Sequence, residues 1–223
     1  EAVVKFDGDV GFAQDPDADR LAIVDENGRY IGEEYTLALA AEHWLSENPG
    51  ASTAANLSTS RMIDDIAATH GGVSHRAAVG EANVASVMKE HGCIIGGEGN
   101  GGVIFPKVCW VRDSFSSMAL ILDLMQTRDE RLSLIVNALP KYDIIKKAID
   151  LADLGGIPAL DKEIKRLQEQ YSEDKQNNSD GLRIDFEEGW VHIRPSNTEP
   201  IARIIAEAKD SLTAYTIASR VKL

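Results

Sequence analysis

The chain has 223 residues, 43% of them hydrophobic, and a formal net charge of −13. Its length predicts one large domain or two small ones. Such acidity excludes a surface built for nucleic acid or for anionic membranes, because both partners are themselves negative. No apolar run reaches the roughly 20 residues of a membrane span. Cys93 and Cys109 form neither a metal-ligand spacing nor a disulfide framework, so we expect a reducing, cytoplasmic location.

The beginning of the chain reads as part of something longer. Its first residue is Glu1 rather than Met, and the opening EAVVKFDGDV is typical of a strand inside a larger protein. A buried strand is predicted at 21–24, where LAIV runs into the turn-forming DENG. Apolar residues then recur at helical spacing over 33–45 and predict a helix, which NPG ends.

Strand and helix patterns alternate through the next part of the chain. In chain order, the sequence predicts a strand at 52–58, a helix at 59–72, a strand at 73–79, a helix at 81–92, a strand at 93–98 and a helix at 113–126. This alternation predicts a three-layer α/β domain with a mixed, mostly parallel sheet.

The composition changes after Pro140, and we expect a domain boundary around 140–148. The later elements are predicted as a strand at 141–151, a charged amphipathic helix at 159–174, a polar turn at 176–181, a β-hairpin at 181–197, a strand at 199–209 and a helix at 211–223. They predict a smaller α+β unit that is distinct from the first.

The loop DPDADR (15–20) carries Asp15, Asp17 and Asp19 on alternate positions, followed by Arg20. Carboxylates at this spacing can converge on a hard cation such as Mg²⁺ or Ca²⁺, which prefer oxygen ligands. A calcium-binding EF-hand loop is one alternative, but Arg20 stands where that loop needs glycine, and the strand-like LAIV replaces its exiting helix. A solvated acidic turn is the other alternative.

The glycine-rich stretch GGEGNGG (96–102) follows a predicted strand. Glycine lets the backbone approach a ligand closely, and only Glu98 and Asn100 project from the stretch. A carboxylate and an amide at this spacing suit hydrogen bonds to vicinal hydroxyls of a sugar. A flexible hairpin connection explains the same residues equally well.

The stretch RPSNTEP (194–200) offers Arg194, Ser196, Asn197 and Thr198 at the end of a strand. An arginine, two hydroxyls, an amide and exposed backbone N–H groups form an anion nest suited to phosphate. An ordinary β-turn is the alternative, since Pro, Ser and Asn are common in turns.

Two shorter stretches are less specific. In AVGEANV (78–84), Glu81 is expected to be an acid at a helix N-terminus, unless the other candidate sites lie nearby. In WVRDS (110–114), Arg112 either reaches a substrate phosphate or merely precedes a helix capped by Asp113.

Taken in order, DPDADR, GEGNGG and RPSNTEP resemble the metal, sugar and phosphate loops of the α-D-phosphohexomutase family, and the resemblance covers nearly the whole chain. The pairing of VGEANV with GEGNGG is similar to an archaeal and Bacteroidetes branch of phosphoglucosamine mutases and phosphomannomutases/phosphoglucomutases. Histidines stand in other relatives where this chain has Glu81 and Gly102, so roles proposed for those histidines do not transfer.

The resemblance implies a four-domain protein of which this chain is a C-terminal fragment. It assigns 1–30 to the end of domain 2 with the metal loop, 31–140 to the sugar-binding α/β domain 3, and 145–223 to a phosphate-binding, TATA-binding-protein-like domain 4. Domain 1, which carries the phosphorylated serine, has no counterpart here, so the fragment alone is expected to be inactive.

The resemblance also implies roles and a reaction. Asp15, Asp17 and Asp19 would bind Mg²⁺, and Arg20 would be catalytic, either by contacting the phosphoserine or by helping to steer a proton. The sugar hydroxyls would be held by Glu98 and Asn100, and the non-reacting phosphate by Arg194, Ser196, Asn197 and Thr198. The whole protein would interconvert hexose or hexosamine 1- and 6-phosphates through a 1,6-bisphosphosugar. A non-catalytic, metal-dependent phosphosugar-binding module is the alternative. The sequence does not indicate which sugar is preferred or which oligomeric state the protein has.

Overall fold

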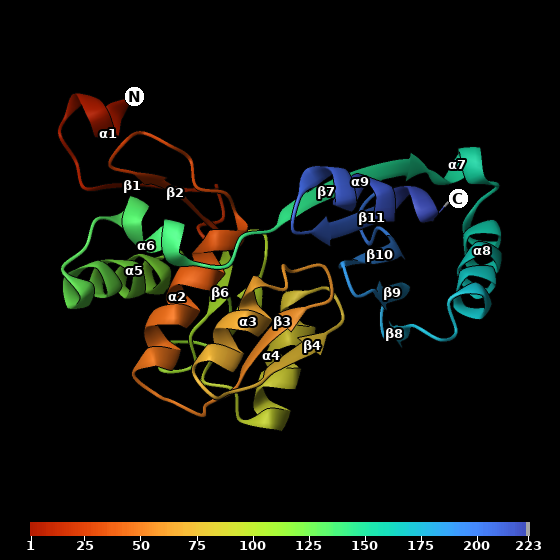
Figure 1. Ribbon diagram of the computed structural model, residues 1–223, viewed down its shortest axis with the longest axis horizontal. Coiled ribbons are helices and arrows are strands. Elements are labelled where there is room, and N and C mark those ends of the chain that lie inside the picture. The colour runs from red at the N-terminus through yellow and green to blue at the C-terminus, as the bar shows by residue number, and fades with distance from the viewer. Residues whose placement is uncertain (222–223) are drawn as a thin grey trace. The chain divides into compact units, whose positions relative to one another are not determined.

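The computed structural model describes residues 1–221, which divide into two compact units (Figure 1). Unit 1 runs from Glu1 to Pro140, and unit 2 begins at Lys141. Each unit has its own sheet and helices, so each is described by itself. Throughout residues 1–221, every helix is too short or too polar to cross a lipid bilayer.

Unit 1 opens with helix α1 (Ala2–Lys5) and an antiparallel hairpin of β1 (Val10–Gln14) and β2 (Leu21–Asp25). The strand at 21–24 is confirmed, but the strand expected at the chain start is wrong. There the amides of Lys5 and Phe6 donate to the carbonyls of Glu1 and Ala2, which closes a helical turn. Local hydrogen bonding therefore overrides the strand preference of the valines.

The sheet of unit 1 has the order β4-β3-β5-β6. The first three strands are parallel and β6 is antiparallel to β5, so the sheet is mixed and mostly parallel, as predicted. Strand β6 was not expected, because the glycines before it hide a strand pattern. The strands are β3 (Thr53–Asn56), β4 (Ser74–Ala77), β5 (Ile95–Glu98) and β6 (Gly102–Ile104).

Helices pack against this sheet and against one another. Val84 and Met88 of α4 share a core cluster with Ala54 of β3 and Ile104 of β6. Helix α2 lies against β5 and β6 and packs on α3 and α5. The helices are α2 (Glu34–Ser46), α3 (Met62–Thr69), α4 (Glu81–His91), α5 (Ser114–Arg128) and α6 (Leu132–Ala138), the last of which was not predicted.

Unit 2 is a five-stranded antiparallel sheet of order β7-β11-β10-β9-β8 with three helices, which confirms the expected α+β unit. Its strands are β7 (Asp143–Asp150), β8 (Lys175–Asn177), β9 (Leu182–Asp185), β10 (Gly189–Pro195) and β11 (Ile201–Ala208). Its helices are α7 (Leu151–Leu154), α8 (Ile157–Gln170) and α9 (Ser211–Arg220).

Two expected boundaries in unit 2 need comment. The polar turn predicted at 176–181 begins later, because β8 extends to Asn177 and pairs with β9. The last helix was predicted over 211–223; α9 ends at Arg220, and residues 222 and 223 lie outside the described residues.

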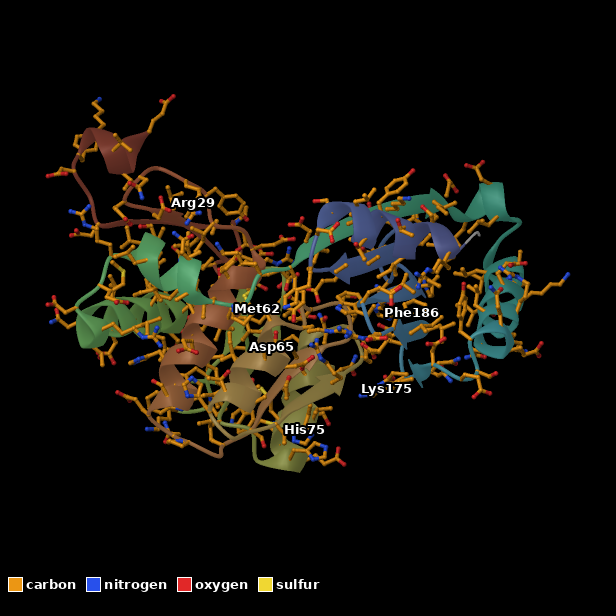
Figure 2. All side chains as sticks on the ribbon, in the orientation of Figure 1. Arg29, Met62, Asp65, His75, Lys175 and Phe186 are labelled. Atoms are coloured by element: carbon orange, nitrogen blue, oxygen red, sulfur yellow. The ribbon has the colours of Figure 1, made fainter. Side chains whose placement is uncertain are left out.

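Strand alternation places the polar residues of β10. Val191 and Ile193 point into a core formed with α8 and α9, so His192 and Arg194 lie on the other face of the sheet. At the margin of that core, Phe186, labelled in Figure 2, packs edge to face against Tyr171 with the ring centroids 5.5 Å apart. The core thus fixes the strand that ends in the RPSNTEP turn.

Candidate functional site

The DPDADR loop connects β1 to β2 and folds around Asp15. The Asp15 carboxylate accepts hydrogen bonds from the amides of Asp19 and Arg20, at 3.2 and 3.3 Å. Ala18 adopts a left-handed conformation with φ of 56°, which a residue with a Cβ rarely does. The loop therefore keeps a strained turn in order to bring its two ends together.

The N-terminus of α5 fixes the same loop from outside. The Ser114 hydroxyl donates to the carbonyl of Ala18 over 2.7 Å and accepts from the Gln14 amide at 2.5 Å. Asp113 caps α5 through the Ser116 amide, at 2.8 Å, which is one of the two interpretations that the sequence left open for this stretch. Residues nearly a hundred positions apart thus hold the aspartate loop in place.

Two of the three aspartates face each other and the third does not. Asp15 and Asp19 are half-buried, and Nε of Arg20 lies 3.8 and 3.9 Å from their carboxylates, whereas Asp17 is exposed. Burial and the neighbouring Asp15 raise the pKa of Asp19, although Arg112 opposes this shift. Partial burial would raise the pKa of Asp15, but hydrogen bonds from the amides of Arg20 and Asp19 outweigh it and lower that pKa.

The side chains of the loop have the chemistry to bind a hard cation, but they are not arranged as a complete coordination site. Within residues 1–221, no three His, Cys, Asp or Glu side chains are gathered as a metal-binding group. The neighbouring carboxyls of Asp15 and Asp19 nevertheless affect each other's pKa, lowering that of Asp15 and raising that of Asp19, as two acids that compete for one proton do. The atoms that these residues could offer to a metal ion are all carboxylate oxygens, the ligands that Mg²⁺ and Ca²⁺ prefer.

The glycine-rich stretch is a hairpin connection between β5 and β6, and it contacts the aspartate loop. The amide of Leu21, which follows Arg20, donates to the carbonyl of Gly101 over 3.0 Å. Gly101 has φ of 89°, and a Cβ there would lie 2.8 Å from the carbonyl oxygen of Leu21. Glycine at 101 is therefore required for the two loops to lie side by side.

Glu98 and Asn100 differ in what they leave available. Glu98 is buried and accepts from the Asn56 amide at 2.7 Å, the Gly80 N–H at 3.0 Å and the Arg112 guanidinium at 2.7 Å. A carboxylate has about four acceptor positions, so Glu98 retains one. Asn100 accepts from the amide of Gly102 and, within the described chain, its side-chain N–H groups donate to nothing.

Arg112 was expected either to reach a substrate phosphate or merely to precede a helix cap, and in the structure it joins these loops. Its guanidinium lies 2.5 Å from Asp19 and 2.7 Å from Glu98, and its Nε lies 3.3 Å from Glu81. In the sequence, the only signal for such a role was the position of this arginine in WVRDS, directly before the predicted helix cap. Glu81 heads α4 as expected, and the aspartate and glycine-rich loops of the same unit lie nearby, since Arg112 contacts both of them and Glu81.

Two further positions of unit 1, Glu81 and Gly102, lie against Arg112. Glu81 Oε2 accepts from the Arg112 backbone N–H at 2.8 Å as well as from its Nε. A Cβ on Gly102 would lie 2.2 Å from the Arg112 side chain, so glycine leaves the space that this side chain fills.

In unit 2, the RPSNTEP stretch is the turn between β10 and β11. The Ser196 amide donates to the Ile201 carbonyl over 2.8 Å, and the Ser196 hydroxyl accepts from the Thr198 amide at 3.4 Å. Asn197 and Thr198 are exposed at the tip. The turn therefore presents hydroxyl, amide and backbone groups to solvent, as both the nest and the plain-turn interpretations require.

Arg194 separates these two interpretations. It is only 4% exposed; its Nε donates to Asp180 over 2.7 Å, but its Nη2 is buried and has no hydrogen-bond partner among residues 1–221. An unmet buried donor costs roughly 1–3 kcal/mol. Where β10 pairs with β11, Arg194 lies opposite Arg203, which forms an ion pair with Glu199. Two arginines at one end of the sheet favour an anion.

His192 is an interior residue of β10. It is fully buried, and its Nε2 lies 2.7 Å from the carbonyl oxygen of Asp180. Burial lowers its pKa to about 4, with Arg183 and Arg194 acting in the same direction. It lies two positions before Arg194 on an interior strand, and an alternating strand pattern does not distinguish a covered face from an exposed one.

Comparison with known proteins matches both units. A family model described as the alpha/beta/alpha domain III of phosphoglucomutase/phosphomannomutase matches residues 32–142, and one for the C-terminal domain of the same family matches 150–222. A phosphoglucomutase/phosphomannomutase of Thermococcus kodakarensis is 39% identical over 94% of this chain and 45% of its own length. The chain spans about half the length of the curated relatives it matches.

Solved structures give the same fold. A phosphoglucomutase/phosphomannomutase family protein of Burkholderia thailandensis has a TM-score of 0.80 and 27% identity, over 98% of this chain and 46% of its own. The N-acetylphosphoglucosamine mutase of Aspergillus fumigatus, solved with GlcNAc-6P and magnesium, has a TM-score of 0.67 and 17% identity, over 94% and 47%. The chain belongs to the phosphoglucomutase/phosphomannomutase family, of which it carries domain III and the C-terminal domain.

Proposed function

We propose that the whole protein containing this chain is a phosphohexomutase that interconverts hexose or hexosamine 1- and 6-phosphates. The phosphoserine that donates and recovers the phosphoryl group lies outside residues 1–223, and a 1,6-bisphosphosugar is the intermediate. The observation that carries the proposal is the buried Nη2 of Arg194, which has no partner in the described part of the chain and lies beside a turn of hydroxyls and amides. Such a donor gains a charge-assisted hydrogen bond when a phosphate binds.

Mg²⁺ is the cofactor in this proposal, held by Asp15, Asp17 and Asp19. When bound, it would supply Lewis-acid charge withdrawal from the phosphoryl oxygens. The carboxylate donor set supports this assignment, as does the magnesium in the A. fumigatus mutase of the same fold. Arg20, beside Asp15 and Asp19, is half-exposed and is assigned to contact the transferring phosphoryl group.

Binding of the sugar is assigned to Asn100 and Glu98, and Asn100 offers it more hydrogen-bonding groups than Glu98 does. Asn100 offers two amide donors, whereas Glu98 offers one remaining acceptor position. Together they would hold vicinal hydroxyls of a hexose ring in either orientation. Neither residue selects among glucose, mannose and glucosamine phosphates, which differ at a single ring substituent.

The non-reacting phosphate is assigned to Arg194, Ser196, Asn197 and Thr198. Arg194 would contribute Nη2, the Ser196 and Thr198 hydroxyls would donate directly, and the exposed Asn197 would close the turn over the anion. These residues would bind whichever phosphate of the bisphosphate is not reacting, so the same turn would serve both half-reactions.

The proposal extends to domain limits and location. Residues 1–30 are assigned to the end of a preceding domain, 31–140 to the sugar-binding domain and 145–223 to the phosphate-binding domain. The chain alone is expected to be inactive because it does not supply the phosphoserine. Free Cys93 and Cys109 support a reducing, cytoplasmic setting.

The test is a steady-state assay of the complete polypeptide. It would be given glucose 1-phosphate, mannose 1-phosphate and glucosamine 6-phosphate in turn, with a hexose 1,6-bisphosphate activator, with and without Mg²⁺. We expect Mg²⁺-dependent isomerisation of at least one sugar phosphate. Binding of these compounds without any isomerisation would contradict the proposal and favour a non-catalytic phosphosugar-binding module.

A further inference from the structure

One guanidinium in unit 1 joins three segments that are far apart in the sequence. Arg112 contacts Asp19 in the aspartate loop, Glu81 at the start of α4 and Glu98 at the end of β5. The Arg112 side chain is 15% exposed and the Glu98 side chain 4%. The Arg112–Glu98 pair is therefore screened by water far less than a surface pair is.

We propose that Arg112, held by Glu81, is a positioning residue that couples the aspartate loop to the glycine-rich loop, so that a cation bound at the first loop orders the second. The inference deepens the proposed function, on which it rests for the identity of the cation. It assigns a role to Arg112 and Glu81, neither of which has one in the reaction proposed above.

The geometry requires an arginine in particular. A planar guanidinium can meet two carboxylates on two different nitrogens at once, here Asp19 on Nη2 and Glu98 on Nη1. A lysine offers a single ammonium point charge, which cannot hold both carboxylates in fixed directions. Replacing Arg112 with Lys therefore keeps the charge and removes the fork.

Glu81 fixes the direction of the fork. One oxygen, Oε2, accepts from the Arg112 backbone N–H at 2.8 Å and from its Nε at 3.3 Å. These two bonds hold the base and the head of the same side chain, so fewer rotamers are open to Arg112. Without the Glu81 charge, the guanidinium is free to follow either of the other two carboxylates alone.

The two oxygens of Asp19 face different partners. Oδ1 is the oxygen nearest Arg20, at 3.9 Å, whereas Oδ2 lies 2.5 Å from Arg112. If Asp19 helps to hold a cation while its Oδ2 stays on the guanidinium, fixing Asp19 would also fix Arg112 and, through it, Glu98. Coupling of this kind is reciprocal, and a sugar on the second loop would then favour the cation on the first.

A second link between the loops provides the alternative explanation. The amide of Leu21 donates to the carbonyl of Gly101 over 3.0 Å, and this backbone bond would survive any change at Glu81 or Arg112. The experiment therefore has to separate an ion-pair route from a backbone route.

The experiment is hydrogen–deuterium exchange of the full-length protein with Mg²⁺ alone as the probe. Exchange in residues 15–25 and 96–105 is compared with and without Mg²⁺ in the wild type, Glu81→Gln and Arg112→Lys. Matched controls are Glu90→Gln, an exposed acid on the same helix as Glu81, and Arg128→Lys, whose arginine pairs with Glu42 instead. Melting temperatures without ligand establish that each variant is folded.

In the wild type and both controls, we expect Mg²⁺ to slow exchange in both segments, at 96–105 by at least about fivefold. In Glu81→Gln and Arg112→Lys, 15–25 should stay protected while the effect on 96–105 falls below about twofold. A purely structural role would lower the melting temperature and leave this transfer of protection unchanged.

Three results would overturn the inference. Protection of 96–105 that persists in both variants assigns the coupling to the backbone bond. No protection at 96–105 in the wild type shows that the loops are not coupled, and none at 15–25 shows that the cation does not bind there. Isomerase activity of the wild type, measured in parallel, judges the proposed function independently of all three.

Discussion

The two candidate binding regions satisfy their charges in opposite ways. In unit 1, the carboxylates of Asp19, Glu81 and Glu98 are already engaged by one guanidinium, Arg112. In unit 2, the guanidinium of Arg194 is engaged by a single carboxylate, Asp180, and keeps a buried nitrogen without a partner among the described residues. The carboxylates of the first region are already paired before a ligand arrives, whereas the second region gains a partner for its arginine from the ligand itself.

This difference has an energetic consequence. Where a network is complete, removing one member leaves the others unpaired, so the cost falls on folding and on the order of the loops. Where a donor is unmet, removing it costs folding little and costs the bound state a strong hydrogen bond. The predictions below exploit this contrast, in order of their expected effect on turnover.

The largest effect is expected for Asp17→Asn in the full-length enzyme. Asp17 is exposed and has no described partner, so the change should leave the melting temperature unaltered. Loss of a metal carboxylate should abolish Mg²⁺-dependent turnover, by at least about 1000-fold. Steady-state kinetics and Mg²⁺ calorimetry measure this, with Asp9→Asn, an exposed acid just before β1, as control. Retained activity would contradict the metal loop.

Arg194→Met should raise the KM for the sugar phosphate by about 100-fold with a smaller change in kcat, because a charge-assisted hydrogen bond to a bound phosphate is lost. Arg194→Lys keeps the charge but not the fork, and should fall between the wild type and the methionine variant. Arg166→Met, on the exposed side of α8, is the control. Wild-type kinetics in both Arg194 variants would remove the phosphate assignment.

Asn100 and Glu98 should separate binding from stability. Asn100→Ala is expected to raise KM about tenfold at an unchanged melting temperature, because its amide donors are free for a ligand. Glu98→Gln places an amide against three donors and should lower the free energy of unfolding by roughly 1–3 kcal/mol. Equal melting temperatures for the two variants would contradict this division of roles.

His192 should affect stability and leave turnover at neutral pH almost unchanged. Folding keeps it neutral with a pKa of about 4, whereas the unfolded chain takes up a proton below about pH 6.5. Stability should therefore fall as the pH drops from about 6.5 to about 4, by up to roughly 3 kcal/mol. Urea unfolding at several pH values measures the loss. A His192→Gln variant that keeps the full pH dependence would contradict it.

Periodicity was enough to predict most of the fold. The strand at 21–24, the alternation of strands and helices that follows, and the β9–β10 hairpin are all present. Alternate residues are buried in β2, whereas β3 and β5 are buried along their whole length. The misses have local causes. Strand β6 was missed because it begins at Gly102, directly after a glycine-rich stretch that does not have a strand pattern. At the chain start, the valines favour a strand, but the backbone hydrogen bonds of Lys5 and Phe6 form a helical turn.

The candidate site was less accessible to sequence reasoning, because its members interact over long separations. Glu98 was expected to be open to a ligand, yet Asn56 and Arg112 occupy most of its acceptor positions. The role of Arg112 depends on Asp19 and Glu81, which lie 93 and 31 positions away in the chain. No local pattern encodes such a convergence.

The most direct test of the mutase assignment is a single-turnover transfer experiment. The full-length protein is phosphorylated with ³²P, freed of excess label and mixed with unlabelled hexose monophosphate and Mg²⁺. The account predicts that the label moves to a hexose bisphosphate within one turnover, and that Asp17→Asn blocks the transfer. Label that stays on the protein, or that is released only as inorganic phosphate, would contradict it.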